Sequence, residues 1–448
     1  MKSPCAHAQL CLGPSSHAQS AGYKRRTARQ LAAAARPSGR ALKSKSQENA
    51  PREAWAFPAP LILPGDDLSW DPKYDPQSLK SWLQEPERNL VTDERKMVYV
   101  VPVPSVAATV NHMTEWIQPK ASRQSTEEVI PRPDPKDVVD YLAAFYTNLP
   151  VKLLSKPKLQ FTSWDDGRPS RKRSKVSYVA LSIGHEAVRI RARPSSDGIF
   201  GGQLNLEDIL DAAIAMLPSD AYALLLLMDH DLYEEEDNDF CCGRAYGGSR
   251  VAVVSSARYN PALDTLQAVE VEHAWPASHC QLYVDSCVRN AENDGASSMK
   301  KAKTAMKEEV AVSHSVSAIQ AAVEAFSSVP ASSQSNAAQW LARVCRTASH
   351  ELGHCFGMDH CVYYACSMQG SAGLSEDARQ PPYICPVDLA KMLRATGADP
   401  GQRYKALLTF CSRFEGQERT FAAFAAWLTY MISSSTIGSS GKPIDVSS

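Results

Sequence analysis

Two features that would place a protein in a membrane or export it are missing from this sequence. No stretch of about 18 apolar residues occurs, which is the length that a helix needs to cross a bilayer. The first residues also lack the apolar core of a secretory signal. We therefore expect no membrane partner and no export.

The chain also lacks an excess of either charge. It carries 48 Lys and Arg against 49 Asp and Glu, a formal net charge of −1. A net charge near zero gives no overall attraction to nucleic acid, so nucleic acid is not expected as a partner. The asymmetry is local, because residues 1–47 contain nine Lys or Arg and no Asp or Glu.

This basic N-terminal segment has few large apolar side chains, so residues 1–55 are predicted to be a disordered tail. Three interpretations stay open. The tail can be a solvated extension, a mitochondrial presequence, or a bipartite nuclear-import signal built on Lys24–Arg29 with Arg40, Lys43 and Lys45. Without a secretory signal, the sequence predicts a cytoplasmic or nuclear protein, with the mitochondrial location as the alternative.

Twelve cysteines without a secretory signal indicate a reducing compartment, where clustered cysteines bind metal more often than they form disulfides. Metal-ligating residues also occur near the N-terminus. Their spacing matches no established pattern, so the sequence predicts no site from Cys5, His7, Cys11 and His17. His230 and His273 are interpreted as surface or core histidines.

A chain of 448 residues fits one domain with extensions better than two full domains. We expect the folded part to cover residues 56–432, followed by a disordered tail over 433–448. Within it, residues 289–336 are rich in Ala, Ser, Lys and Gln and are interpreted as a partly helical, low-complexity surface insertion. A helix is predicted over 337–356, and a mostly helical C-terminal subdomain over 357–432.

Strand and helix patterns alternate before the predicted helix 337–356. Residues 222–228 form a fully apolar run, which is typical of a central strand covered on both faces. Further strands are predicted over 97–102, 151–161, 178–190 and 250–256, and helices over 137–149, 206–217, 387–393 and 423–432. The fold class is therefore α/β (α+β), with a mixed-sheet N-terminal subdomain.

The most specific pattern is His-Glu-x-x-His-x-x-Gly-x-x-His, which runs from His350 to His360. Residues four apart lie on one face of a helix, so His350 and His354 can bind one Zn²⁺. Gly357 can adopt the left-handed conformation that ends a helix, and the chain can then return His360 as a third ligand.

Three neutral imidazoles leave zinc with its full charge and a fourth position open for water, whose pKa falls to about 7. Glu351 follows the first ligand directly, so it is placed to take a proton from that water and pass it to the leaving amine. The sequence therefore predicts a zinc peptidase that cleaves peptides or proteins by attack of the zinc-bound water.

The residues that follow the motif sharpen this prediction. Cys361, Cys366 and Met368 have the spacing Cys-x4-Cys-x-Met, and Cys385 lies downstream. The succession resembles the archaemetzincin (archaelysin) family of zinc metallopeptidases. The motif block covers residues 350–388, and weaker similarity extends upstream through 97–104 and 220–261.

The resemblance implies a metzincin-like fold, a Met-turn at Met368 beneath the histidines, and a second, structural zinc held by Cys361, Cys366 and Cys385. Here Asp388 stands where the family pattern has a fourth cysteine. A carboxylate can bind zinc, so Asp388 is the predicted fourth ligand. Water, a remote cysteine such as Cys411, or an empty site remain alternatives.

The resemblance also places the segment after Cys241 and Cys242 at a substrate-facing edge strand. An extended peptide can pair with such an edge by main-chain hydrogen bonds, so Gly243 and Ala245 are predicted substrate-binding residues. The competing interpretation is a catalytically weak or inactive, zinc-stabilised interaction protein. Nothing in the sequence argues against a monomer.

Overall fold

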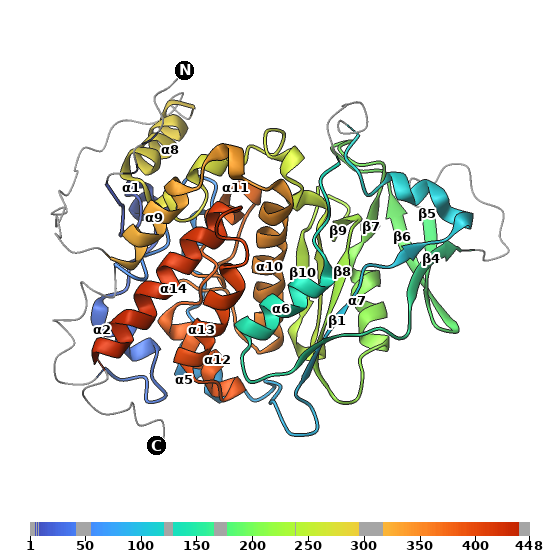
Figure 1. Cartoon of the computed structure of the whole chain (residues 1–448), viewed down its shortest axis with the longest axis horizontal. Coiled ribbons are helices and arrows are strands. Elements are labelled where there is room, and N and C mark those ends of the chain that lie inside the picture. The colour runs from blue at the N-terminus through green and yellow to red at the C-terminus, as the bar shows by residue number, and fades with distance from the viewer. Residues whose placement is uncertain are drawn as a thin grey trace.

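Two β-sheets and a set of helices make up the structure (Figure 1). The computed structural model describes residues 5, 7, 9–41, 55–120, 129–164, 177–237, 239–294 and 317–438. None of the helices in these ranges is both long and apolar enough to cross a membrane.

The first sheet has five strands in the order β10-β11-β8-β1-β3. Four of them run parallel, and β10 pairs antiparallel with β11 at one edge. The strands are β1 (Met97–Val101), β3 (Val151–Leu153), β8 (Ala221–Met228), β10 (Gly243–Tyr246) and β11 (Val251–Ser255).

Strand β8 is buried along its whole length, as its apolar run predicts. Its side chains alternate between two cores. Leu225 faces a core shared with helices α6 (Pro135–Phe145) and α10 (Asn336–Cys355), and Leu226 faces a core shared with α7 (Leu206–Ala215). Helices on both faces explain why no polar residue is tolerated in this strand.

The second sheet lies on the α7 side and has the order β2-β4-β5-β6-β7-β9. The predicted strand over 151–161 is two strands, and the run over 178–190 is a hairpin that turns at Gly184. The strands are β2 (Ser105–Val106), β4 (Leu159–Ser163), β5 (Ser177–Ile183), β6 (Glu186–Arg193), β7 (Gln203–Asn205) and β9 (Asp231–Tyr233).

Helix α10 stands between the first sheet and the C-terminal helices (Figure 1). The Ser335 side chain caps its first turn by accepting a hydrogen bond from Ala338 N. Its buried face, which includes Leu341, Val344 and Leu352, packs in the core that Leu225 enters. The helix predicted over 337–356 is thus confirmed within one residue of each end.

Helices make up the chain after α10 over the described residues, as predicted for this subdomain. They are α11 (Leu374–Asp377), α12 (Pro386–Thr396), α13 (Pro400–Cys411) and α14 (Arg419–Gly438). Helix α14 extends six residues beyond the predicted end of the fold at residue 432, and the rest of the predicted tail, 439–448, lies outside the described residues. Short 3₁₀ helices complete the description: η1 (Ala108–Glu115), η2 (Gly247–Ser249), η3 (Ala257–Tyr259), η4 (Pro261–Leu263), η5 (Val271–His273), η6 (Ala277–His279) and η7 (Ala331–Ser333).

The N-terminal segment departs from the expectation of disorder. Residues 9–41 contain α1 (Ser16–Ala21) and α2 (Ala28–Ala34), and they pack on distant parts of the chain. Tyr23 is buried and donates a hydrogen bond to Val362 O. A segment that is too polar to form its own core can still be ordered by the core of its neighbours, which local composition cannot reveal. Two further short helices, α4 (Asp67–Trp70) and α5 (Leu79–Gln84), follow in residues 55–96.

The tract 289–336 also differs in part from the expected surface insertion. Residues 295–316 lie outside the described residues, and α8 (Gln281–Asp294) precedes them. Helix α9 (Ala318–Ser328) packs against α14 and buries Ile319 and Phe326 in the main core. This part of the tract is therefore a core element, because its small residues let two helices approach closely.

Candidate active site

Helix α10 carries two histidines that point at the same spot. His350 and His354 lie one turn apart, and their Nε2 atoms are 3.0 Å apart. The other ring nitrogen of each faces a backbone carbonyl: His350 Nδ1 lies 2.7 Å from Ser367 O, and His354 Nδ1 lies 2.7 Å from Met358 O. These carbonyls can only accept, so they fix the proton on Nδ1 of both rings.

This proton assignment tests whether the site suits a metal. With both protons on Nδ1, two Nε2 lone pairs face each other at 3.0 Å, which is repulsive without a cation between them. Burial and the neighbouring imidazoles also lower the pKa of His350 well below its usual value, so the rings are held neutral. Neutral imidazoles oriented by backbone carbonyls are the state in which histidine ligates zinc.

The end of α10 brings in the third histidine. Gly357 has φ +72°, and Met358 N donates to Gly353 O at 3.2 Å, which closes the helix in a left-handed cap. The chain then reverses, and one ring nitrogen each of His350, His354 and His360 lies within 4.8 Å of the others. The predicted function of Gly357 in this turn is thereby confirmed.

A segment near the N-terminus secures this turn. Gln77 donates from Nε2 to Gly357 O at 2.9 Å, and its Oε1 accepts from Asp359 N at 3.1 Å. The same Oε1 accepts from Lys391 Nζ at 2.8 Å. One side chain thus ties the loop before His360 to α12.

Two further residues flank His360, and the motif gave no sign of either. A side chain at Gly370 would overlap the carboxylate of Asp67 and would lie 2.9 Å from His360 Nδ1. The Asp67 carboxylate therefore lies near Nδ1 of this ring. Burial lowers the pKa of His360, whereas the charge of Asp67 raises it. The Tyr74 ring lies 5.8 Å from that of His360, centroid to centroid, and lines the cleft.

Glu351 is 7% exposed and lies under the edge strand β10. A side chain at Gly243 would come within 3.0 Å of Glu351 Oε1, so the strand crosses directly over this carboxylate. Burial raises the pKa of Glu351 to about 8, whereas the charge of Arg244 lowers it. A divalent cation beside the carboxylate would lower the pKa further and favour the proton acceptor.

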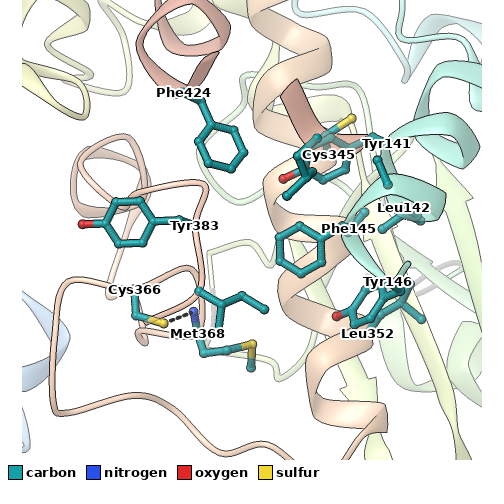
Figure 2. Close-up of a cluster of buried hydrophobic side chains, with 14 of the residues drawn as sticks. Tyr141, Leu142, Phe145, Tyr146, Cys345, Leu352, Cys366, Met368, Tyr383 and Phe424 are labelled. Carbon is teal, nitrogen blue, oxygen red and sulfur yellow. Dashed lines mark hydrogen bonds between the residues drawn. The ribbon is translucent and has the colours of Figure 1, made fainter. Parts of the chain in front are cut away.

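Met368 packs beside the helix that carries the histidines (Figure 2). Its thioether fills the space where a side chain at Gly353 would stand, and Met368 N lies 3.5 Å from Cys366 Sγ. A side chain at position 353 would overlap Met368, which contacts the helix between His350 and His354. The Met-turn that the resemblance implies at Met368 stays a prediction.

A second group of potential metal ligands lies next to Met368. It consists of three thiols and one carboxylate, all buried and all within 4.8 Å of one another: Cys361, Cys366, Cys385 and Asp388. Asp388 Oδ2 lies 3.3 Å from Cys385 Sγ and 3.4 Å from Cys366 Sγ. Burial raises the pKa of the Cys361 thiol, but hydrogen bonds from Cys366 and Cys385 outweigh it and hold that pKa well below its usual value.

The second carboxylate oxygen of Asp388 is hydrogen-bonded outside this group of four. Asp388 Oδ1 accepts a hydrogen bond from Lys391 Nζ at 2.8 Å, and both side chains are buried. The lysine offsets negative charge that three thiolates and a carboxylate would bring to one zinc ion. Cys411, the alternative ligand, is buried on α13 and does not belong to the group.

Strand β10 offers an unpaired edge to the cleft. Ser255 N donates to Cys242 O at 2.8 Å, and hydrogen-bonded pairs alternate along an antiparallel ladder. Arg244 and Tyr246 therefore bond to β11, and the backbone groups of Gly243 and Ala245 point away from it. Both predicted substrate-binding residues line a cleft of about 810 Å³ that also contains the three histidines and Glu351.

Charged and polar side chains form the far wall of this cleft. Arg346 and Asp377 form an ion pair there, and Thr347 Oγ1 donates to Tyr259 Oη at 2.7 Å. Arg244 lies on the strand side and pairs with Glu234 at 3.2 Å. The cleft is therefore open and polar, which suits a backbone-rich ligand better than an apolar one.

Known proteins resemble this chain over most of its length. Residues 308–394 match the family model described as Peptidase family M54. Archaemetzincin-2 of Macaca fascicularis is 25% identical over 351 residues, which are 78% of this chain and 73% of that relative. Archaemetzincin-2 of Rattus norvegicus is 47% identical over 68 residues, 15% of this chain and 19% of that relative. The crystal structure of archaemetzincin from Methanopyrus kandleri matches at 16% identity and a TM-score of 0.30, over 69% of this chain and 99% of that chain.

Proposed function

We propose that this chain is a zinc metallopeptidase of the archaemetzincin type, which hydrolyses peptide bonds of extended peptides or proteins with Glu351 as general base and acid. His350, His354 and His360 would hold the catalytic zinc. The observation that carries the proposal is the pair of Nε2 lone pairs, 3.0 Å apart, in the same cleft as the buried Glu351 carboxylate.

Zinc bound by these three histidines would supply a Lewis acid that lowers the pKa of water to about 7 and polarises a carbonyl. Burial lowers the pKa of all three histidines, so the rings stay neutral. The hydrogen bonds from Nδ1 to the carbonyls of Ser367 and Met358 orient His350 and His354.

Glu351 moves the proton. Its carboxylate accepts a proton from the attacking water and returns it to the amine that leaves. An amide nitrogen leaves poorly unless it is protonated, so a single buried carboxylate that acts first as base and then as acid serves both steps. The β10 strand above Glu351 shields the carboxylate from bulk water and keeps the transfer local.

Strand β10 would hold the substrate. An extended peptide that adds to this edge can exchange main-chain hydrogen bonds with Gly243 and Ala245. Because Gly243 lies next to Glu351 and Ala245 lines the same cleft, a peptide paired there would pass its backbone over the three histidines. Recognition through the backbone is compatible with many side chains in the substrate.

We also propose that Cys361, Cys366, Cys385 and Asp388 bind a second zinc with a structural function. Three thiolates and one carboxylate fill a tetrahedral site and leave no position open for chemistry. The group ties the loop after His360 to α12 and to the Met368 turn. It would therefore stabilise the floor of the catalytic site.

A quenched-fluorescence peptide library tests the peptidase. We expect cleavage of some peptides, complete loss of cleavage with a zinc chelator, and recovery when zinc is restored. If no peptide is cleaved by the zinc-loaded protein, the competing interpretation of a zinc-stabilised interaction protein is favoured instead.

The edge strand can be tested separately with Ala245→Pro. Proline removes an N–H that points at the substrate and not at β11, so kcat/KM should fall by about tenfold, the effect of one or two hydrogen bonds, while zinc content stays unchanged. Ala245→Gly keeps the N–H and is the matched control. Equal kcat/KM for the two variants would show that substrate does not pair with this edge.

A further inference from the structure

We propose a further zinc site, formed by Cys5, His7 and His273 with Cys280 as the fourth ligand, which fastens the N-terminal segment to the body of the protein. One ligand atom each of Cys5, His7 and His273 lies within 4.8 Å of the others. Cys280 lies outside this group of three, and its Sγ is 3.2 Å from Cys5 Sγ. The group is separate from both sites described above and does not depend on peptidase activity.

His273 is held in the state of a metal ligand. Its Nδ1 lies 3.2 Å from Glu270 Oε2, and its ring stacks on Tyr283 with centroids 4.1 Å apart and planes 9° apart. A carboxylate at Nδ1 fixes the proton there and leaves the lone pair on Nε2. Nε2 is buried and has no hydrogen-bond partner among the described residues.

His7 shows the same sign of a missing partner. Its Nε2 is also buried without a hydrogen bond in the described part of the chain. The two rings meet edge to face, with centroids 5.6 Å apart. Burying a ring nitrogen without a hydrogen bond is unfavourable, and the described residues contain two such nitrogens at one place.

The backbone at His7 carries strain as well. Its φ is +47°, in the left-handed region that residues other than glycine rarely adopt. Such strained backbone conformations occur often at ligand-binding positions. A bond from His7 to an ion would offset both the strain and the buried nitrogen.

Backbone pairing brings the two halves of the site together. Cys11 N donates to His279 O at 2.7 Å, Gln281 N donates to Gln9 O at 2.9 Å, and Leu10 bridges Cys280 in antiparallel fashion. Residues 9–11 therefore run beside 279–281. This pairing sets Cys5 and His7 over η5 and η6, which carry His273 and lead into Cys280.

The ligand set identifies the ion. Two thiolates and two imidazoles form a closed tetrahedral zinc site, in which the ion charge is neutralised by the two sulfurs. The other two potential ligands of the N-terminal segment, His17 and Cys11, form hydrogen bonds outside this group. His17 Nε2 lies 2.9 Å from Ser69 Oγ, and Cys11 Sγ donates to Gly13 O at 3.2 Å.

Zinc content of the full-length protein tests the site. We expect His7→Ala and His273→Ala each to contain one zinc per chain less than the wild type by plasma mass spectrometry. His17→Ala, a histidine of the same segment outside the group, should match the wild type. Equal zinc in wild type and His7→Ala, or the same loss in His17→Ala, would overturn the proposal.

Thiol alkylation of the wild-type protein gives a second measurement that needs no variant. In a phosphine-reduced buffer, alkylation of Cys5 and Cys280 should be about tenfold or more slower with zinc than after chelation, because zinc-bound thiolates are protected. A Cys5–Cys280 disulfide would protect both residues without reductant and lose that protection on reduction, whatever the zinc. That pattern, or no effect of chelation, would contradict a zinc site.

Discussion

Replacing Glu351 with Gln is expected to lower kcat/KM for peptide hydrolysis by at least about 10³-fold, while the catalytic zinc stays bound. General acid–base catalysis contributes about 10²–10⁴ in rate, and the same carboxylate serves both proton transfers here. Glutamine fills the same space beneath Gly243 and cannot accept the proton. Peptide kinetics and zinc analysis on the same sample measure the two effects separately.

Glu234→Gln is the matched control for this variant. Glu234 is a carboxylate of the same cleft region, paired with Arg244 at 3.2 Å, and it has no position beside the histidines. Its loss removes the same charge and should leave most of the activity. Substantial turnover by Glu351→Gln would remove Glu351 from the proposed function.

Cys385→Ala should remove the second zinc and destabilise the C-terminal subdomain strongly. The free energy of binding a structural zinc contributes directly to folding, so we expect the free energy of unfolding to fall by at least about 3 kcal/mol. The variant also leaves Asp388, Lys391 and two thiols buried without their shared ion. Zinc per chain should drop by one, as measured by mass spectrometry.

Cys345→Ala separates the loss of metal from the loss of a buried sulfur. Cys345 is fully buried in α10 and lies outside the group of four. Its substitution removes the same atom from the core and should keep the zinc content of the wild type. If urea unfolding and zinc content were alike for the two variants, no structural zinc would depend on Cys385.

The proposed catalytic residues are the part of the structure that the sequence predicts most directly. A helix repeats every 3.6 residues, so the spacing of His350 and His354 already places both on one face, and Gly357 marks the turn that returns His360. The apolar run of β8 is equally direct, because only a strand covered on both faces needs such a run. In both cases the information is local, within about one turn of helix or one strand.

The support around the site was not predictable in this way. Asp67 and Gln77 contact the loop around His360 from almost 300 residues away, and neither lies in a recognisable motif. Asp388 was recognised as a departure from the family pattern, but its bond to Lys391 was not. Side chains that meet through tertiary packing leave no periodic signal in either segment.

The N-terminal segment shows most clearly what the sequence alone does not predict. Its composition predicts disorder, and the spacing of Cys5, His7, Cys11 and His17 predicts no metal site. The structure orders residues 9–41 through contacts such as Tyr23 with Val362, and it sets Cys5 and His7 against His273. Half of that ligand group comes from elsewhere in the chain, so spacing within the segment could not identify it.

The sequence by itself determined the chemistry of this protein: a helix with two histidines and a carboxylate, a turn, a third histidine, and a nearby set of thiols. Only the tertiary structure decided what surrounds that chemistry. It placed the free edge of β10 over Glu351, Met368 beside Gly353, and the N-terminal segment against η5 and η6. Ligand spacing follows from the geometry of one helix, whereas these contacts depend on how distant segments share one core.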